Sequence, residues 1–185
     1  MKRSITALTL ALAVVLSLVI SVAADVSRLE LDNIAQSLVN ANRLRLEGDI
    51  DVDASRAYGV AAIYYGGNSR SRIAVDPRKM QSTSANSWAF ILGHELSHEI
   101  HRHNGSSGAA QEFQADVTGA VLAINAGYDL RSYIIDMYSQ PNSCSRTHGC
   151  FHSRARNLEL KFRVNTGLWD GSHRNHTVAS GAFPR

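Results

Sequence analysis

The chain has 185 residues, which suits a single domain with a hydrophobic core of its own. Its composition is ordinary for a globular protein, and its formal net charge of +3 falls to +1 if an N-terminal leader containing Lys2 and Arg3 is removed. No cluster of Lys and Arg interleaved with aromatic residues is present, so nucleic acid is excluded as an expected partner.

Residues 1–24 have the pattern of a secretory signal peptide. Two basic residues come first, an apolar stretch follows over residues 5–20, and residues 22–24 offer small side chains for cleavage after Ala24. We therefore expect a periplasmic or secreted protein. The alternative is an uncleaved leader, because this stretch is about long enough to span a bilayer and would associate the protein with the membrane.

The first part of the mature chain predicts one helix and a small sheet. Apolar residues recur at three-to-four spacing over residues 25–47, which predicts a helix packed across the back of the domain. Residues 50–53 form a brief strand or loop. Residues 58–65 and 71–75 are rich in β-forming side chains and flank a Gly-Gly-Asn-Ser turn, so we expect a β-hairpin.

The chemistry is concentrated in the stretch Gly93-His94-Glu95-Leu96-Ser97-His98-Glu99, which contains the pattern H-E-x-x-H. It lies inside a predicted helix over residues 84–104, where residues four apart share one face. His94 and His98 can therefore bind one metal ion, and zinc suits such an imidazole pair. Glu95 is turned about 100° away, where it can act as general base on a metal-activated water.

A third protein ligand is expected, because catalytic zinc usually has three ligands and an open position. A metzincin pattern would need Gly at 101 and His at 104, but His101 and Asn104 stand there. The next predicted helix, over residues 108–126, carries Glu112 and Asp116 four residues apart. A short connection makes the two helices antiparallel neighbours, so Glu112 can complete the site and Asp116 can orient a ligand histidine.

Other residues of the two helices are given minor roles. Ser107 is expected to cap the second helix and Gly127 to end it. His101 lies seven residues after His94, and a third ligand there would need about 10.5 Å of helical rise, so we expect it at the edge of the site or in a local hydrogen bond. His103 is expected to be an ordinary exposed helix residue.

The C-terminal third predicts a short helix over residues 130–138, a polar loop, and a last helix over residues 151–164. The loop holds the only two cysteines, Cys144 and Cys150, and an even count in an exported protein predicts a disulfide between them. Two free thiols or a minor metal site are the alternatives. Residues 165–185 form an aperiodic tail whose histidines are expected at the surface.

Three segments together resemble the HtpX-type and CAAX-prenyl-endopeptidase superfamily of zinc peptidases. They are His94-Glu95-Leu96-Ser97-His98, Glu112-Phe113-Gln114-Ala115-Asp116 and Ala126-Gly127-Tyr128-Asp129, and the resemblance covers about residues 55–160. The resemblance implies His94, His98 and Glu112 as ligands of one zinc ion, Glu95 as general base and Asp116 as a residue that supports a ligand.

The resemblance also suggests residues that would stabilise the reaction. Related peptidases often carry T-H-P with an arginine six residues after the histidine, and Thr147-His148 with Arg154 fits this spacing, with glycine in place of proline. His152 and Arg156 offer a competing register. Such a cation near the zinc would stabilise the oxyanion. In similar peptidases an edge strand binds the substrate, and residues 72–75 are the expected edge here.

The sequence thus predicts an α+β protein: a mainly helical zincin-like domain over residues 25–164 with a small β-hairpin or sheet beside the metal-binding helix. Compared with the family, the interval between the motifs is short and only one hydrophobic N-terminal stretch is present, so we expect a minimal soluble form. The expected function is an exported zinc endopeptidase acting on polypeptides. The alternatives are a catalytically silent, zinc-stabilised binding or chaperone-like module of the cell envelope, and an effector secreted beyond the cell.

Overall fold

The structure is a computed structural model that describes residues 26–45, 49–57, 59–65, 71–103, 108–145, 148–169 and 171. The predicted signal peptide and most of the C-terminal tail lie outside these residues, as do Ser107 and Thr147. Within the described part of the chain, no helix combines the length and the apolar character needed to cross a membrane.

Six helices and two small sheets follow one another along the described chain. The elements are α2 (Arg28–Ala41), β1 (Asp49–Val52), β2 (Ala61–Tyr65), β3 (Ser71–Val75), α3 (Pro77–Met80), α4 (Ala85–Ile100), α5 (Ala109–Asn125), α6 (Leu130–Ser139), β4 (Cys144–Ser145), β5 (Gly149–Cys150) and α7 (Phe151–Phe162). This mainly helical content with small sheets confirms the predicted α+β class.

The first sheet has the strand order β1-β3-β2, with β1 parallel and β2 antiparallel to β3. The hairpin predicted from the sequence is present, and the brief segment before it is a true strand. The expectation that residues 72–75 form the free edge was wrong, because β3 is the central strand. Strand β1 pairs with one side of β3 and β2 with the other. The edge strand beside α4 is therefore β2.

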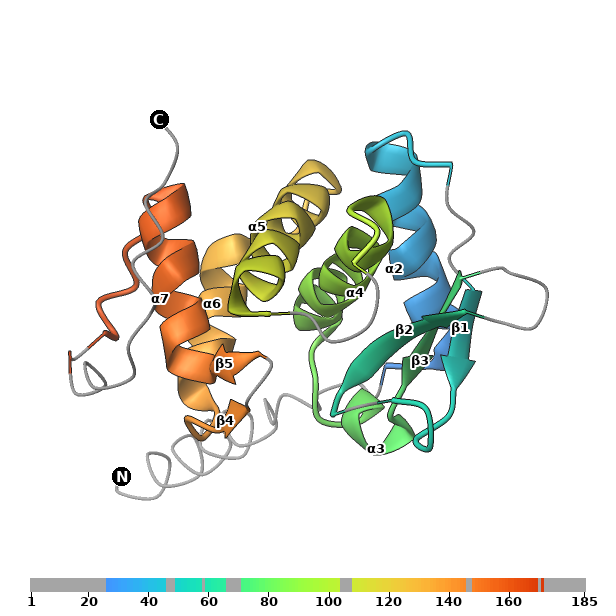
Figure 1. Cartoon of the computed structure of the whole chain (residues 1–185), viewed down its shortest axis with the longest axis horizontal. Helices are drawn as coiled ribbons and strands as arrows, with labels where there is room; N and C mark the ends of the chain where they lie inside the picture. Colours follow the sequence, from blue (N-terminus) through green and yellow to red (C-terminus); the bar gives the residue numbers. More distant parts are fainter. Residues whose placement is uncertain are drawn as a thin grey trace, which may run out of the picture.

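Helices α4 and α5 run side by side through the middle of the molecule, with the sheet and α2 on one side and α6 and α7 on the other (Figure 1). One hydrophobic core connects these layers, and Trp88 of α4 is its largest fully buried side chain. The predicted helix at 25–47 is shorter than expected, because α2 starts after the N-cap Ser27 and ends at Ala41. Its buried face packs against α4, as the apolar spacing predicted.

The ends of α4 are set by local hydrogen bonds. At its start, the Ser84 hydroxyl accepts a hydrogen bond from the backbone N–H of Ser87, 3.1 Å away, as an N-cap residue does. At its end, Arg102 has a φ of +53° and closes the helix, so α4 is shorter than the predicted 84–104. The metal-binding motif consequently occupies the last two turns of the helix.

The N-cap of helix α5 is Gly108, one residue after the predicted cap Ser107, so the helix starts at Ala109. It ends at Asn125 with Ala126 as its C-cap, and Gly127 follows with a φ of +90° that glycine adopts without steric cost. Asp129 then caps α6, and the Asn86 side chain of α4 bonds both to its N–H and to its carbonyl oxygen, at 2.9 and 3.1 Å. The Ala-Gly-Tyr-Asp segment is therefore a helix-to-helix turn fastened to α4.

Two glycines bring α4 and α5 into direct backbone contact. A Cβ placed on Gly93 would lie 2.7 Å from the carbonyl oxygen of Gly119, and a Cβ on Gly119 would lie 2.5 Å from the backbone nitrogen of His94. Both distances are too short for any side chain, and backbone atoms cannot move aside cheaply. The close approach of the two helices at the level of His94 therefore depends on both glycines.

We predict that Gly119→Ala lowers the free energy of unfolding by roughly 1–3 kcal/mol, the usual cost of overpacking. The sign is informative, because alanine is a better helix former than glycine by about 1 kcal/mol and helix propensity alone predicts a gain. Chemical denaturation followed by circular dichroism measures the change.

Gly108→Ala is the matched control, because a Cβ there meets no atom within 4 Å and the φ of Gly108 is −83°. We expect a loss of no more than about 1 kcal/mol from the weaker N-cap residue. If Gly119→Ala is as stable as the wild type, the two helices can separate without cost and the close contact is not required.

Candidate metal centre

Three buried side chains converge between α4 and α5. His94 and His98 project from α4 and Glu112 from α5, and one potential ligand atom of each lies within 4.8 Å of the other two. The Nε2 atoms of the two imidazoles are 3.1 Å apart, and the Glu112 carboxylate lies 3.3 Å from Nε2 of His94 and 3.8 Å from Nε2 of His98. The structure thus brings together the three residues that the sequence proposed as ligands.

The donor set fits zinc. Two imidazole nitrogens and one carboxylate form the usual three-ligand set of a catalytic zinc, which leaves a fourth position for water or substrate. Glu112 is only 2% exposed, and a buried carboxylate beside two imidazoles is costly unless a cation or protons balance it. His94, His98 and Glu112 would hold the ion.

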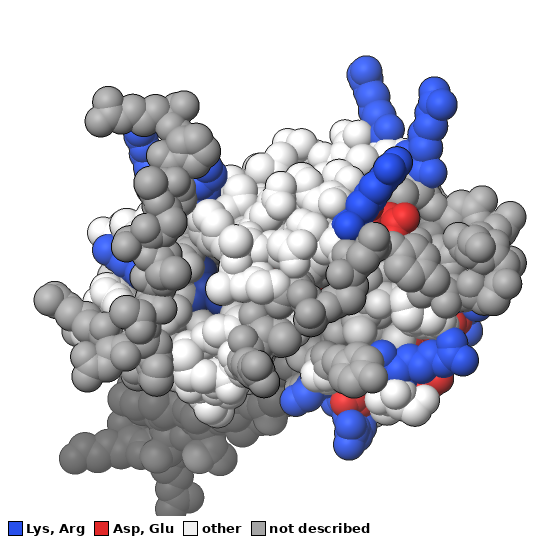
Figure 2. All heavy atoms as spheres, in the orientation of Figure 1, with Lys and Arg blue, Asp and Glu red and all other residues white. Residues whose placement is uncertain are grey.

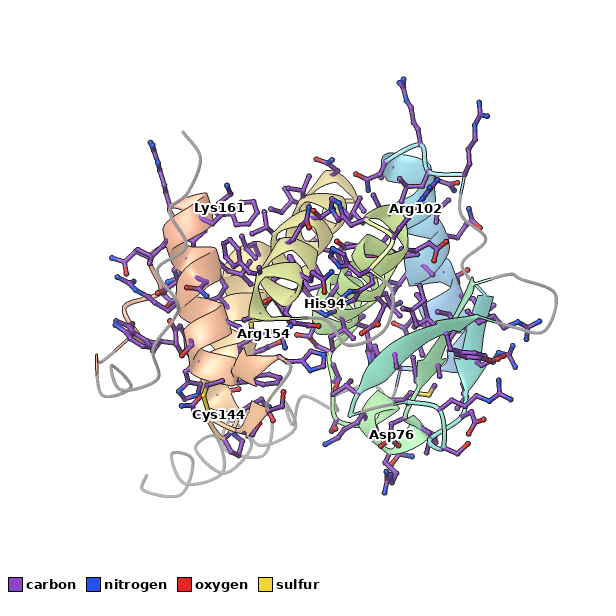
Figure 3. The ribbon with its side chains drawn as sticks, viewed as in Figure 1. Asp76, His94, Arg102, Cys144, Arg154 and Lys161 are labelled. Atoms are coloured by element: carbon purple, nitrogen blue, oxygen red, sulfur yellow. A yellow bond between two sulfur atoms is a disulfide. The ribbon has the colours of Figure 1, made fainter. Side chains whose placement is uncertain are left out.

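Behind His94, hydrogen bonds link the buried Asp116 to the partly buried Arg154. The Asp116 carboxylate lies 2.9 Å from Nδ1 of His94, the ring nitrogen that faces away from Glu112. Arg154 of α7 donates to both oxygens of the same carboxylate, and its side chain points from α7 toward α4 (Figure 3). Such a carboxylate fixes the orientation of a ligand histidine.

The neighbouring charges shift the pKa values of Asp116 and His94 in opposite directions. Burial alone would raise the pKa of Asp116, but Arg154 and His94 outweigh it and hold that pKa well below its ordinary value of 3.8. Burial would lower the pKa of His94, yet Asp116 and Glu112 raise it to about 9. Burial and the adjacent His94 lower the pKa of His98 to about 4. In the metal-free site these shifts favour a proton on His94 over one on His98.

Glu95 is held in place by the sheet. Its Oε2 accepts a hydrogen bond from the backbone N–H of Ile63 in β2, 2.9 Å away, and only 7% of the residue is exposed. Burial raises the pKa of Glu95, while the charge of His94 and the Ile63 hydrogen bond oppose this shift. The carboxyl group is thus next to the candidate metal ligands in a setting that favours proton uptake.

The structure separates the two residues predicted to stabilise an oxyanion. His148 reaches the site: its Nε2 lies 3.3 Å from Glu112, and 40% of its side chain is exposed. Arg154 instead faces Asp116, on the Nδ1 side of His94, so its contacts are those of a supporting residue. Of these two residues, His148 is the one that lies near Glu112, and burial lowers the pKa of its imidazole, which disfavours the cationic form.

The competing register lies elsewhere. His152 contacts the carbonyl oxygen of Gln140, 3.0 Å away, and Arg156 pairs with the buried Glu159 at 2.9 Å. The loop before α7 is closed by a disulfide between Cys144 and Cys150, which are also register partners in the small sheet β4-β5. This bridged loop carries His148 to the site.

Three features of the site had no clear signal in the sequence. The hydrogen bond between Ile63 and Glu95 uses a backbone group, and the contact of Gly93 with Gly119 depends on helix packing. His103 was expected to be an exposed helix residue, but this was wrong. It follows the end of α4 and its Nδ1 lies 3.0 Å from Nδ1 of His98.

Figure 2 shows the charge distribution around this region. Most of the visible Lys and Arg side chains lie toward the edges of the face, while the described surface over the middle of the molecule is largely uncharged. The carboxylates of the site, Glu95, Glu112 and Asp116, are buried.

An imidazole pair four residues apart on one helix and a carboxylate from the next helix are the defining arrangement of a gluzincin-type metal centre. Comparison with protein families agrees with this class: the profile of peptidase family M48 matches residues 25–109, just under half of the chain. This match supports an assignment of the chain to the M48 family of metallopeptidases. The matched span includes α4 and ends before Glu112. The assignment of Glu112 as a ligand therefore depends on its position in the structure beside the two histidines. Comparisons with curated proteins and with solved structures found no match.

We predict that Arg154→Met lowers the stability of the metal-free protein by roughly 3–5 kcal/mol, because it leaves the buried Asp116 carboxylate without its cation. The lowered pKa of Asp116 contributes stability that is present above the unfolded-state pKa near 3.8 and is lost as the pH falls below it. Without Arg154 this carboxyl takes up a proton at higher pH. Acid unfolding followed by circular dichroism should therefore move to higher pH.

Arg28→Met provides the control, because Arg28 and Asp32 form a pair at 3.9 Å whose side chains are 63% and 43% exposed. Exposed pairs contribute little, so we expect no measurable shift. An acid transition that is the same for Arg154→Met and Arg28→Met would contradict a stabilising role of the buried pair.

Proposed function

We propose that the protein is an exported, zinc-dependent endopeptidase that hydrolyses peptide bonds of unfolded or envelope proteins. The observation that carries this proposal is the convergence of His94, His98 and Glu112 beside a buried Glu95. The match to a peptidase family over residues 25–109 supports the reaction class, and the chemistry of the donor set favours zinc. Export rests on the predicted signal peptide alone.

The residues divide into three roles. His94, His98 and Glu112 hold the ion. Zinc, when bound, polarises the scissile carbonyl and lowers the pKa of water to about 7. Glu95 accepts the proton of the attacking water and returns it to the leaving amine.

His148 supplies a hydrogen-bond donor on the exposed side of the site. Its Nε2 is close to Glu112, and its backbone N–H donates to the Ser145 hydroxyl at 2.9 Å, within the loop closed by the disulfide. A donor fixed in this position can stabilise the negative charge that develops on the carbonyl oxygen. Arg154 acts indirectly, by fixing Asp116 and through it His94.

Strand β2 is the proposed binding edge for the substrate. The N–H of Ile63 points away from β3 toward Glu95, and because backbone groups of a strand alternate with a period of two, Ala61 presents its N–H and carbonyl oxygen to the same side. An extended polypeptide can pair with the N–H and carbonyl oxygen of Ala61 and so lie beside Glu95. Binding through main-chain atoms implies weak side-chain selectivity.

We predict that Glu95→Gln retains stoichiometric zinc but loses cleavage of unfolded casein by roughly 10²–10⁴-fold, the usual contribution of a general base. Wild-type cleavage should stop when a chelator is added and return with zinc. Metal analysis and a protease assay on the same preparation separate binding from catalysis.

Two outcomes would contradict this proposal. Full cleavage by a clean Glu95→Gln preparation would remove the assigned base. A wild-type protein that binds zinc and protects unfolded casein from aggregation without cutting it would instead support the alternative, a zinc-stabilised binding module.

We predict that His148→Ala lowers kcat by roughly 10–10³-fold with zinc content unchanged, because it removes a donor to the developing oxyanion and none of the three ligands. His152→Ala is the control, since the ring of this neighbouring histidine bonds to the carbonyl oxygen of Gln140. Equal kcat values for the two variants would exclude His148 from the reaction.

A further inference from the structure

We propose that His103 is a positioning residue that fixes the ring of His98, the second of the two candidate histidine ligands. This inference rests on the proposed zinc site. The Asp116 carboxylate supports only His94, and His98 needs a partner for its own Nδ1. In the described part of the chain that partner is Nδ1 of His103, 3.0 Å away.

The backbone holds His103 in this position. The N–H of His103 donates to the carbonyl oxygen of His98 at 2.9 Å, and the N–H of Arg102 donates to that of Glu99 at 3.0 Å. Together with the φ of +53° at Arg102, these bonds form a Schellman turn. His103 is therefore bonded to His98 twice, once through the backbone and once through the rings.

The left-handed turn alone does not distinguish the end of α4 from the ends of other helices. Arg43 and Arg163 adopt the same backbone conformation after α2 and α7, with φ values of +52° and +56°. At the end of α4, however, the residue that follows the arginine presents an imidazole to a candidate metal ligand. The ring of His103 also packs edge-on against the ring of His98, with centroids 5.1 Å apart.

The hydrogen bonds continue beyond His103 in one consistent direction. The Nε2 atom of His103 lies 3.1 Å from Oε1 of Gln114, and the amide nitrogen of Gln114 lies 3.1 Å from Nδ1 of His101. Nε2 of His101 then lies 2.9 Å from the Thr118 hydroxyl oxygen. A chain of side chains thus leads from His98 to the outer side of α5.

This series of hydrogen bonds fixes which ring nitrogens of the histidines carry a proton. When Nε2 of His98 holds a metal ion, the remaining proton of the neutral ring is on Nδ1 and is donated to Nδ1 of His103. His103 then carries its proton on Nε2 and donates it to the Gln114 carbonyl oxygen, whose amide group in turn donates to His101. Every donor meets an acceptor, so the chain selects the tautomer of His98 that presents Nε2 to the metal.

The test is zinc affinity, measured for the purified full chain by competition with a chromophoric chelator. We expect His103→Ala to bind zinc 10–100-fold more weakly, as loss of a partner of a metal-ligating histidine usually does. His103→Asn should bind more tightly than His103→Ala, because the asparagine Oδ1 can accept the same hydrogen bond. The absorption spectrum of the cobalt-substituted protein should change for His103→Ala, since the His98 ring is free to rotate.

His101→Ala is the matched control, because it breaks the far end of the chain and leaves the bond between His98 and His103 intact. Its affinity should fall less than that of His103→Ala. If His103→Ala does not fold, Gln114→Leu replaces it: this variant keeps both rings, removes the acceptor of His103, and should bind zinc more weakly than His103→Asn.

The outcomes separate this inference from the function on which it rests. A wild-type protein that binds no zinc, or whose zinc affinity is unchanged by His94→Ala, overturns both. Zinc binding that is lost in His94→Ala but unchanged in His103→Ala overturns the inference alone. Equal weakening by His103→Ala and His103→Asn also overturns it, because the acceptor at Nδ1 would then be irrelevant.

Discussion

The contact between Gly93 and Gly119 is the constraint on which the site depends. These residues have no side chains, so the backbones of α4 and α5 touch immediately beside His94. The side chains of Glu112 and Asp116 are short, and they reach the imidazoles of α4 only because the two helices are this close. Glu112 and Asp116 then fall on opposite sides of the His94 ring, one near Nε2 and one near Nδ1.

The buried charges make the C-terminal helix part of the site. Asp116 would be costly in the interior without a cation, and Arg154 of α7 supplies that cation. The same helix follows directly from the disulfide-closed loop that carries His148. One segment of the chain therefore supports the ligands from behind with Arg154 and completes the exposed side with His148. This explains why His148 and Arg154, which have the spacing of a single family motif, have different contacts.

The sequence predicted what depends on regular periodicity. Residues four apart on a helix share a face, so the placement of the pairs His94–His98 and Glu112–Asp116 followed from helix geometry alone. Which strand forms the free edge could not be predicted, because it depends on where β1 docks. The role of His103 was missed for a related reason: the helix ends in a left-handed turn at Arg102, and an arginine gives no signal for such a turn.

The candidate metal centre is arranged so that a proton and a metal ion compete for one position. In the metal-free protein, Asp116 and Glu112 raise the pKa of His94 to about 9, while burial and His94 lower that of His98 to about 4. A raised histidine pKa contributes stability that is complete below the unfolded-state value near 6.5 and is lost as the pH rises through the folded-state value. Metal binding requires the neutral ring. A rise in pH therefore weakens the internal pairing that holds the metal-free site together and at the same time favours the ion that replaces the proton.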